Sequence, residues 1–202
     1  MHIFSNCFRK TKFLKLVISL LAMSLFQNKY RIGSTRLPEY DYSNPGWYYV
    51  TICTKNKEGF FGEVKNDKMI LNELGIIVER EWLKTKEIRK NVELDYYVIM
   101  PNHIHGIIIL DDNVETRRGV SLQLKFKNKF SNPIKNSLSI IINQFKGSVK
   151  RWCNKNGFSY FHWQPRFHEH IIRNDKSLYE IRKYMINNPL KWSIDLENPN
   201  RN

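Results

Sequence analysis

The sequence predicts an α/β fold of the α+β kind, in which helices pack on a mainly antiparallel sheet. Runs rich in aromatic and β-branched residues, typical of strands, occur in mixed order with amphipathic helical periods. Two such runs, 93–100 and 103–110, are separated only by Pro101 and Asn102, which predicts adjacent strands joined by a tight turn. The chain has 202 residues, 42% of them hydrophobic, which favours one globular domain with a sizeable core.

The segment before the first of these runs is expected to hold three strands and one helix. Apolar side chains recur every three or four residues in the helix, so that one face would be buried. The expected elements are a strand at 47–54, a hairpin of 60–64 with 68–71 around Asn66 and Asp67, and a helix over 74–82. In the run 93–100, period-two alternation predicts one shared face for Leu94, Tyr96, Val98 and Met100.

The strand after the tight turn carries two histidines. Residues i and i+2 of a strand point to the same face, so His103 and His105 would project side by side, with Ile104 buried on the opposite face. Two neutral imidazoles at this separation can hold one divalent metal ion and leave its other positions for oxygen ligands. The alternative is a pair of half-buried histidines whose ring nitrogens bond to backbone carbonyls. The surrounding sequence favours the metal site.

The residues that follow are expected to form a loop and a second helix. Residues 114–135 show little periodicity and many cations, which predicts a basic loop. From Leu138 to Trp152 apolar side chains recur at helical spacing, and the opposite side of this helix offers Lys146 and Lys150, one turn apart.

A short strand around 162–170 is expected to lead into a third helix. Ser177 and Glu180 have the spacing of a capping box at the start of this helix. Asn188 and Pro189 are expected to end it, because the residue before a proline disfavours the α conformation.

Charge is concentrated in one stretch of the chain. The net charge is +14, from 33 basic and 19 acidic residues, and residues 116–168 contain no Asp or Glu. Such a basic stretch is typical of nucleic-acid binding, and a merely solvated basic surface is the alternative. The cations expected to contact DNA are Arg117, Arg118, Lys146, Lys150, Arg151, Arg166 and Arg173.

The cysteines and the first 28 residues bear on the cellular compartment in which the protein acts. Three cysteines without paired spacing are expected to be reduced thiols in a cytoplasmic protein. Residues 1–28 combine a basic start with an apolar run that is too short to span a bilayer. We expect this extension to precede the true translation start, with a secretory signal as the alternative, and the working domain to span 29–202.

Two blocks of sequence resemble a known family. The run 101–106, Pro-Asn-His-Ile-His-Gly, resembles the histidine–hydrophobic–histidine motif of single-tyrosine HUH endonucleases and transposases. Residues 163–174, followed by 184–192, resemble the C-terminal signature of the REP-associated tyrosine transposases, which are related to the smallest insertion-sequence transposases. The resemblance runs from about Tyr30 to Pro199.

This resemblance implies a fold, an activity and a site. The fold would be the ferredoxin-like or RRM-like core of HUH nucleases. The activity would be that of a metal-dependent transposase that cuts single-stranded DNA beside hairpins of repeated extragenic palindromes through a 5′-phosphotyrosine. Tyr184 would be the nucleophile, and His103, His105 and Asn188 would hold Mg²⁺ or Mn²⁺. The protein would act as a monomer or homodimer on single-stranded or hairpin DNA, without a membrane, in the cytoplasm near the nucleoid.

Other interpretations remain open at this point. A non-catalytic protein that binds DNA hairpins, derived from a transposase, would share most of these features. A zinc-dependent hydrolase is weaker, since no clear third strong ligand accompanies the histidines. Tyr179 competes with Tyr184 but lies outside the Tyr-x-x-x-Asn-Pro pattern, and the segment 167–170 could supply a ligand or contact DNA.

Overall fold

The computed structural model describes residues 24–26, 29–31, 40–111, 136–195 and 197–200. The chain divides into two units, Met1–Tyr40 and Asp41–Asn202. In the first unit, β1 (Ser24–Phe26) pairs antiparallel with β2 (Lys29–Arg31). The expected basic loop 114–135, with Arg117 and Arg118, lies outside the described residues, as does most of the expected extension 1–28.

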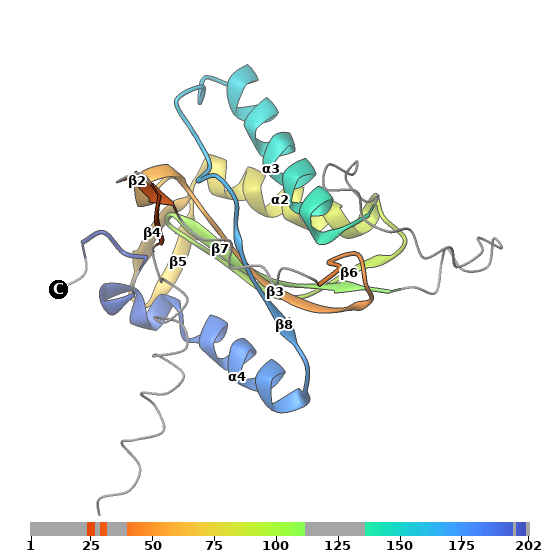
Figure 1. Ribbon diagram of the computed structural model, residues 1–202. Coiled ribbons are helices and arrows are strands. Elements are labelled where there is room, and N and C mark those ends of the chain that lie inside the picture. Colours follow the sequence, from red (N-terminus) through yellow and green to blue (C-terminus); the bar gives the residue numbers. More distant parts are fainter. Residues whose placement is uncertain (1–23, 27–28, 32–39, 112–135, 196, 201–202) are drawn as a thin grey trace, which may run out of the picture. The chain divides into compact units, whose positions relative to one another are not determined.

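The second unit is built on a four-stranded antiparallel sheet in the order β6–β7–β3–β8 (Figure 1). A separate hairpin follows β3, and Asn66 and Asp67 take positive φ at its turn, as expected for a two-residue hairpin loop. The strands are β3 (Gly46–Cys53), β4 (Gly62–Lys65), β5 (Lys68–Leu71), β6 (Val92–Met100), β7 (His103–Leu110) and β8 (His168–Ile172). The helices are α2 (Glu73–Glu87), α3 (Leu138–Lys155) and α4 (Asp175–Ile186), with 3-10 turns η1 (Lys55–Lys57) and η3 (Pro189–Ile194).

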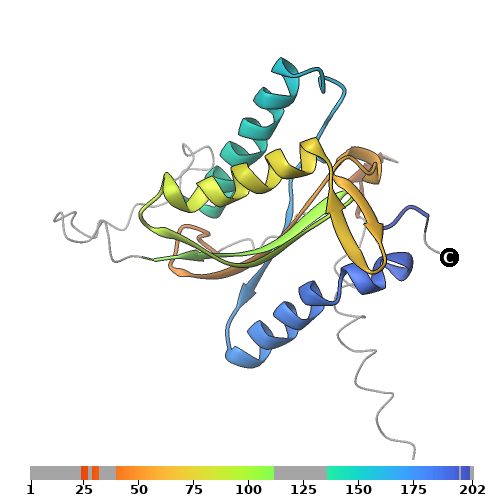
Figure 2. The same cartoon turned by 180° about the vertical axis from the view of Figure 1, so that it is seen from behind.

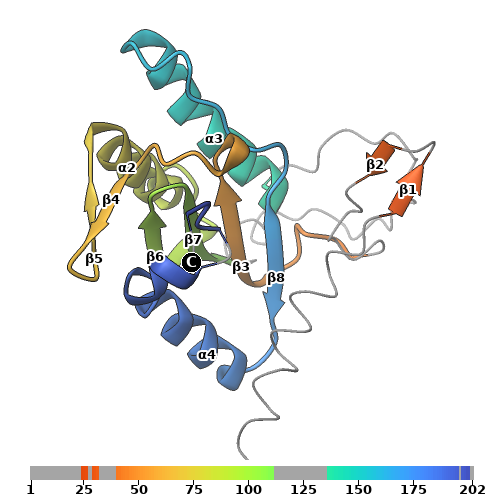
Figure 3. The same ribbon diagram turned by 90° about the vertical axis from the view of Figure 1, so that its left-hand side faces the viewer.

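The helices cover both faces of this sheet. Helices α2 and α3 pack together on one face, and α4 lies across the other (Figures 2 and 3). Apart from the β4–β5 hairpin, the order strand, helix, strand, strand, helix, strand is that of a ferredoxin-like core. The predicted fold class is therefore confirmed, and α4 is the element added to that core. Among the described residues, no helix is long and apolar enough to cross a membrane.

The strands β6 and β7 are joined as predicted, but β6 does not present the predicted face. Met100 pairs with His103 across the turn. Leu94 lies opposite Ile108 and Tyr97 opposite Gly106, so β6 has one more residue than β7 between these two pairs. This bulge exchanges the faces of the side chains beyond it. Leu94 lies opposite Ile108, on the face beneath α2 and α3, whereas Val98 lies opposite His105 and packs with the cluster beneath α4, so the predicted single face was wrong.

The face under α2 and α3 is an apolar core. The indole of Trp82 is fully buried and meets the ring of Phe145 edge-on, with 5.4 Å between centroids. Gly106 lets this indole approach the sheet, because a Cβ atom at that position would collide with the Trp82 ring. Ile104 and Ile108 of β7 are fully buried. Alternation in β7 thus gives the sheet one dry face and leaves the histidines on the other.

Helix α4 has a different N-cap from the one predicted, and it ends just before Asn188 and Pro189 as predicted, but not for the predicted reason. The side chain of Asn174, not Ser177, caps the first turn by accepting the Ser177 N–H at 2.9 Å. The helix ends at Ile186, yet Asn188 keeps α-helical dihedrals although Pro189 follows. The chain therefore turns on into η3 instead of leaving the helix in extended form. The expectation that Asn188 disfavours this conformation was wrong.

Candidate active site

The two histidines of β7 lie side by side beneath α4. His103 pairs with Cys53 and His105 with Thr51 of β3, and their ring centroids are 4.4 Å apart. Both side chains are buried, with 0% and 3% of their surface exposed. They share one face, as the His-x-His spacing predicts, while Ile104 packs in the core on the other face.

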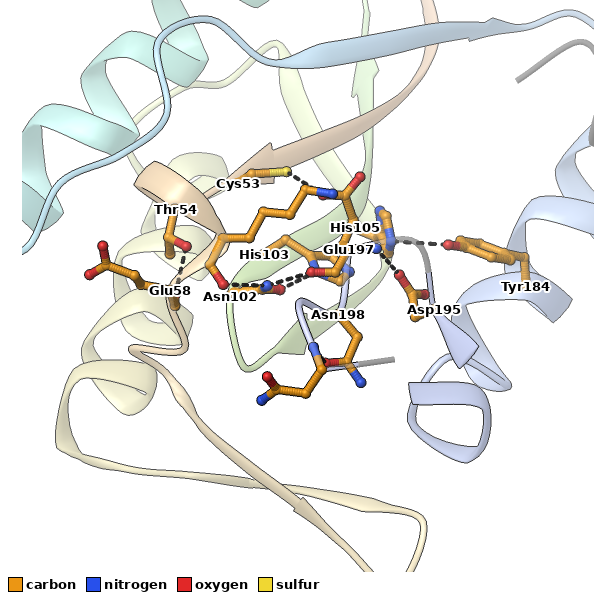
Figure 4. A network of polar contacts seen from close by, with 12 residues as sticks. Cys53, Thr54, Glu58, Asn102, His103, His105, Tyr184, Asp195, Glu197 and Asn198 are labelled. Carbon is orange, nitrogen blue, oxygen red and sulfur yellow. Dashed lines mark hydrogen bonds and ion pairs between the residues drawn. The ribbon is translucent and has the colours of Figure 1, made fainter. Parts of the chain in front are cut away.

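Asn102 fixes the tautomer of His103 (Figure 4). The amide nitrogen of Asn102 donates to the carbonyls of Lys57 and Glu197, at 2.8 and 2.7 Å. Its Oδ1 therefore faces His103 and accepts from Nδ1–H at 2.8 Å. The other ring nitrogen, Nε2, is left with a lone pair. It is buried and has no hydrogen-bond partner in the part of the chain that the structure describes.

Asn188 lies beside His103 and presents its oxygen to it. Its side chain is 1% exposed, and its Nδ2 donates to Asp195 Oδ2 at 3.0 Å. Its Oδ1 is buried and, within the described residues, also lacks a hydrogen-bond partner. Burial lowers the pKa of His103, and a smaller, opposing contribution from Asn188 shows that the two side chains are neighbours. Two acceptor atoms thus lie close together without a proton between them.

His105 connects this pair to Tyr184. Its Nδ1 lies 2.8 Å from the Tyr49 hydroxyl and 2.9 Å from that of Thr51, and either oxygen can accept from Nδ1–H. In that tautomer Nε2 carries a lone pair, and it lies 3.4 Å from the hydroxyl of Tyr184 (Figure 4). The rings of His105 and Tyr184 meet edge-on, with 5.3 Å between centroids. The tyrosine singled out in the sequence therefore reaches the histidines.

The groups of the site are neutral near pH 7. Burial lowers the pKa of His103 to about 4, against the opposing charges of Asp195 and Glu197. Burial, and then the neighbouring His103, lowers the pKa of His105. Burial, and then the charge of Asp195, raises the pKa of Tyr184. Neutral imidazoles are the form that binds metal ions, while the tyrosine keeps its proton at rest.

The segment after α4 adds groups that the sequence did not reveal. Asp195 accepts a hydrogen bond from Asn188, and its charge adds to burial in raising the pKa of Tyr184. Glu197 receives hydrogen bonds from Asn102 and Cys53 (Figure 4). Among the described residues, no group of three or more His, Cys, Asp or Glu side chains could hold a metal ion. The carboxylates therefore surround the candidate ligands and do not join the histidines as a third ligand. In the sequence they look like ordinary charges near the C-terminus.

Lys146 and Lys150, two of the predicted DNA-binding cations, donate to backbone carbonyls of the protein. Lys146 Nζ donates to the carbonyls of Gln164 and Arg166, at 2.6 and 2.7 Å, and burial lowers its pKa to about 8. Lys150 Nζ donates to the carbonyls of Ser159 and Phe161, at 2.8 and 2.6 Å. Both lysines connect α3 to the segment that leads into β8. Arg151, Arg166 and Arg173 have exposed side chains. A DNA-binding role for these five residues stays a prediction.

Comparison with known proteins supports the fold and gives a relative. No family model matches the sequence. A solved structure of a REP-associated tyrosine transposase bound to a REP hairpin is similar in fold, with a TM-score of 0.52 and 22% sequence identity. The match covers 78% of this chain and 73% of that one. An uncharacterized protein of Haemophilus influenzae is 38% identical over 172 residues, which are 83% of this chain and 96% of that protein. The chain belongs to the same protein family as this Haemophilus influenzae protein.

Proposed function

We propose that the protein is a metal-dependent, transposase-like enzyme that cuts single-stranded DNA beside a hairpin, with Tyr184 as nucleophile. One observation carries the proposal. The Tyr184 hydroxyl lies 3.4 Å from His105 Nε2, at a point where His103 Nε2 and Asn188 Oδ1 are buried without hydrogen-bond partners in the described residues. A nucleophile thus stands next to a set of donor atoms that would accept a cation.

The donor set fits a divalent metal ion. His103 and His105 would supply Nε2 atoms, and Asn188 would supply Oδ1. Buried polar atoms without partners are rare in proteins, and a cation would compensate for the lone pairs that converge here. A bound Mg²⁺ or Mn²⁺ would neutralise charge on a phosphate oxygen and polarise the phosphorus. Asn102 holds His103 in the tautomer that this binding requires.

The reaction would be a transfer of the phosphoryl group to tyrosine. The oxygen of Tyr184 would form a bond to phosphorus, the bond from phosphorus to the 3′ oxygen would break, and a 5′-phosphotyrosine and a free 3′-hydroxyl would result. The raised pKa of Tyr184 means that its proton must leave as the oxygen attacks. That proton balances the one gained by the 3′ oxygen. The packing of Ile181 and Met185 against the sheet holds the helix that carries the nucleophile.

DNA is the partner that charge and fold support. The net charge of +14 favours binding to a polyanion, because each phosphate contact releases counterions. The similar solved structure is that of a transposase bound to a REP hairpin. A hairpin with an unpaired flank is therefore the substrate to test first.

The test uses end-labelled hairpins with randomised single-stranded flanks, incubated with Mg²⁺ or Mn²⁺ and separated on a denaturing gel. We expect wild-type protein to form a covalent adduct, and Tyr184→Phe to bind the same hairpins without forming it. Tyr179→Phe is the matched control, because Tyr179 lies on the same helix with 62% of its side chain exposed, and it should keep full activity. An adduct formed by Tyr184→Phe contradicts the assignment. Binding without any adduct in wild type would favour the non-catalytic hairpin-binding protein.

A further inference from the structure

The amide of Asn188 is useful to a cation in only one of its two orientations. Its oxygen can bind a cation, whereas its NH₂ group cannot. Rotation by 180° would bring Nδ2 towards His103, where an N–H group could donate to the lone pair on Nε2. That hydrogen bond would satisfy Nε2 and close the site to a metal ion, but it would turn the Asn188 oxygen towards the carboxylate of Asp195. The direction of this amide therefore decides whether the donor set exists.

Asp195 holds the amide in the open orientation. A carboxylate only accepts hydrogen bonds, so the Asn188 group facing Asp195 Oδ2 at 3.0 Å must be the NH₂ group. The second oxygen, Oδ1, accepts the backbone N–H of Glu197 at 2.7 Å. Because one carboxylate oxygen is tied to the backbone, the other is held in place for Asn188. A charged acceptor also makes a stronger hydrogen bond than a neutral one.

The turn after α4 brings these two residues together. Pro189 starts η3, whose last turn closes with the Asp195 N–H donating to the Trp192 carbonyl at 3.1 Å. The ring of Trp192 lies 6.0 Å from that of His103, so η3 packs beside the histidines. Asp195 consequently projects towards Tyr184 and the histidines (Figure 4). Asp195 lies seven residues after Asn188, and its carboxylate is within hydrogen-bond distance of the Asn188 side chain.

We propose that Asp195 is a positioning residue, which keeps the Asn188 carbonyl oxygen directed at His103 and so completes the donor set for a divalent cation. This inference rests on the metal site under the proposed function, but not on the cleavage reaction. It assigns a task to a carboxylate that does not itself join the histidines as a ligand.

The experiment measures Mn²⁺ binding to the metal-free full chain by titration calorimetry and by the electron paramagnetic resonance of free Mn²⁺. Asp195→Ala removes the acceptor and should weaken Mn²⁺ binding by about 10–100-fold, as loss of an outer partner of a metal ligand does. Asp195→Asn has a single oxygen, which can accept from either Asn188 or the backbone N–H of Glu197, so it should bind Mn²⁺ less tightly than wild type and more tightly than Asp195→Ala. If Asp195→Ala binds Mn²⁺ as tightly as wild type, the proposal fails.

A double-mutant cycle isolates the orientation. In Asn188→Asp the side chain presents an oxygen whichever way it rotates, so removal of Asp195 should then not weaken Mn²⁺ binding, and it should strengthen it by relieving the repulsion between two carboxylates. An equal loss in both backgrounds would overturn the proposal. If Asp195→Ala does not fold, as judged by its thermal transition, Asp195→Ser takes its place, since this shorter side chain cannot reach Asn188 from the same position.

Failure of the inference and failure of the proposed enzyme give different results. Wild type that binds no divalent cation overturns this inference and the metal site together. Wild type that binds Mn²⁺ and cuts DNA, with Asp195→Ala unchanged in affinity, overturns the inference alone. If the Mn²⁺ affinity depends on Asp195 but the protein forms no DNA adduct, the inference is supported. Only the proposed enzyme activity is then contradicted.

Discussion

The two faces of the central sheet handle buried polar atoms in different ways. Beneath α2 and α3, the side chains of β7 are apolar, and within the described residues the indole nitrogen of Trp82 is a single donor without a partner. Beneath α4, His103 Nε2 and Asn188 Oδ1 come from distant parts of the chain and leave two acceptors close together. A lone unpaired donor in a core is a defect of packing. Two acceptors that converge beside a tyrosine are what we interpret as the candidate site.

The difference also appears in the charged residues of the two sides. On the side of α3, the ammonium groups of Lys146 and Lys150 each reach two backbone carbonyls, so they serve the fold. On the side of α4, the charge of Asp195 is directed at groups that would serve the reaction. Stability should therefore depend mainly on the first side and activity mainly on the second.

The largest expected effect is a loss of stability from the apolar side. Trp82→Ala should lower the free energy of unfolding by about 3–5 kcal/mol, because it leaves a cavity beneath α2 and α3. Urea unfolding followed by circular dichroism measures it. On the other face, Tyr184→Phe should change the same quantity by no more than about 0.5 kcal/mol. Similar losses in both variants would contradict the division between the faces.

The second prediction concerns Lys146, which the sequence assigns to DNA. Lys146→Met should lower the free energy of unfolding by about 1.5–3 kcal/mol, since it removes hydrogen bonds from a charged donor to two carbonyls. The salt dependence of hairpin binding should stay nearly unchanged. Arg151→Gln is the control on the same helix, and should leave stability intact while reducing the salt slope by about 1 if Arg151 contacts a phosphate. If Lys146→Met instead leaves the free energy of unfolding unchanged and reduces the salt slope of hairpin binding, Lys146 is a DNA contact after all.

The sequence predicted the parts of the fold that depend on local spacing. Two residues between two apolar runs fix the β6–β7 hairpin, and the i, i+2 rule places His103 and His105 on one face. A bulge cannot be predicted in this way, because the alternation of side chains between the two faces of the strand continues on both sides of the inserted residue. The bulge between Leu94 and Tyr97 is visible only in the register with β7.

The candidate site was predicted as far as the motif extends and no further. Tyr184 and Asn188 stand in a recognisable block, but Asp195 lies beyond Pro189, where the sequence predicts the end of the helix. Packing beside the histidines instead keeps Asn188 helical and turns η3 back over the site. The lysines of α3 show the same limit. Periodicity identifies the polar side of a helix, but not the carbonyls that this side will meet.

A smaller effect is expected where the apolar face is tightest. Gly106→Ala should lower the free energy of unfolding by about 1–3 kcal/mol, because the new methyl group collides with the Trp82 ring. Gly147→Ala, in the interior of α3, meets only the end of the flexible Arg151 side chain and should raise the same quantity by about 0.5–1 kcal/mol. Thermal unfolding compares the two. A Gly106→Ala variant as stable as wild type would show that the face beneath α2 can adjust.

The smallest expected change in stability belongs to the ion pair that ties α4 to the sheet. Arg182 donates to both oxygens of Asp95 at 2.8 Å, and its side chain is 41% exposed, so Arg182→Met should lower the free energy of unfolding by only about 0.2–1 kcal/mol. Adduct formation should fall much further, since this two-point contact fixes the helix that carries Tyr184, and a displacement of about 1 Å can slow a reaction about 100-fold. Arg182→Lys keeps the charge without the planar fork, and should recover stability more fully than adduct formation. Unchanged adduct formation in Arg182→Met would show that packing alone positions the tyrosine.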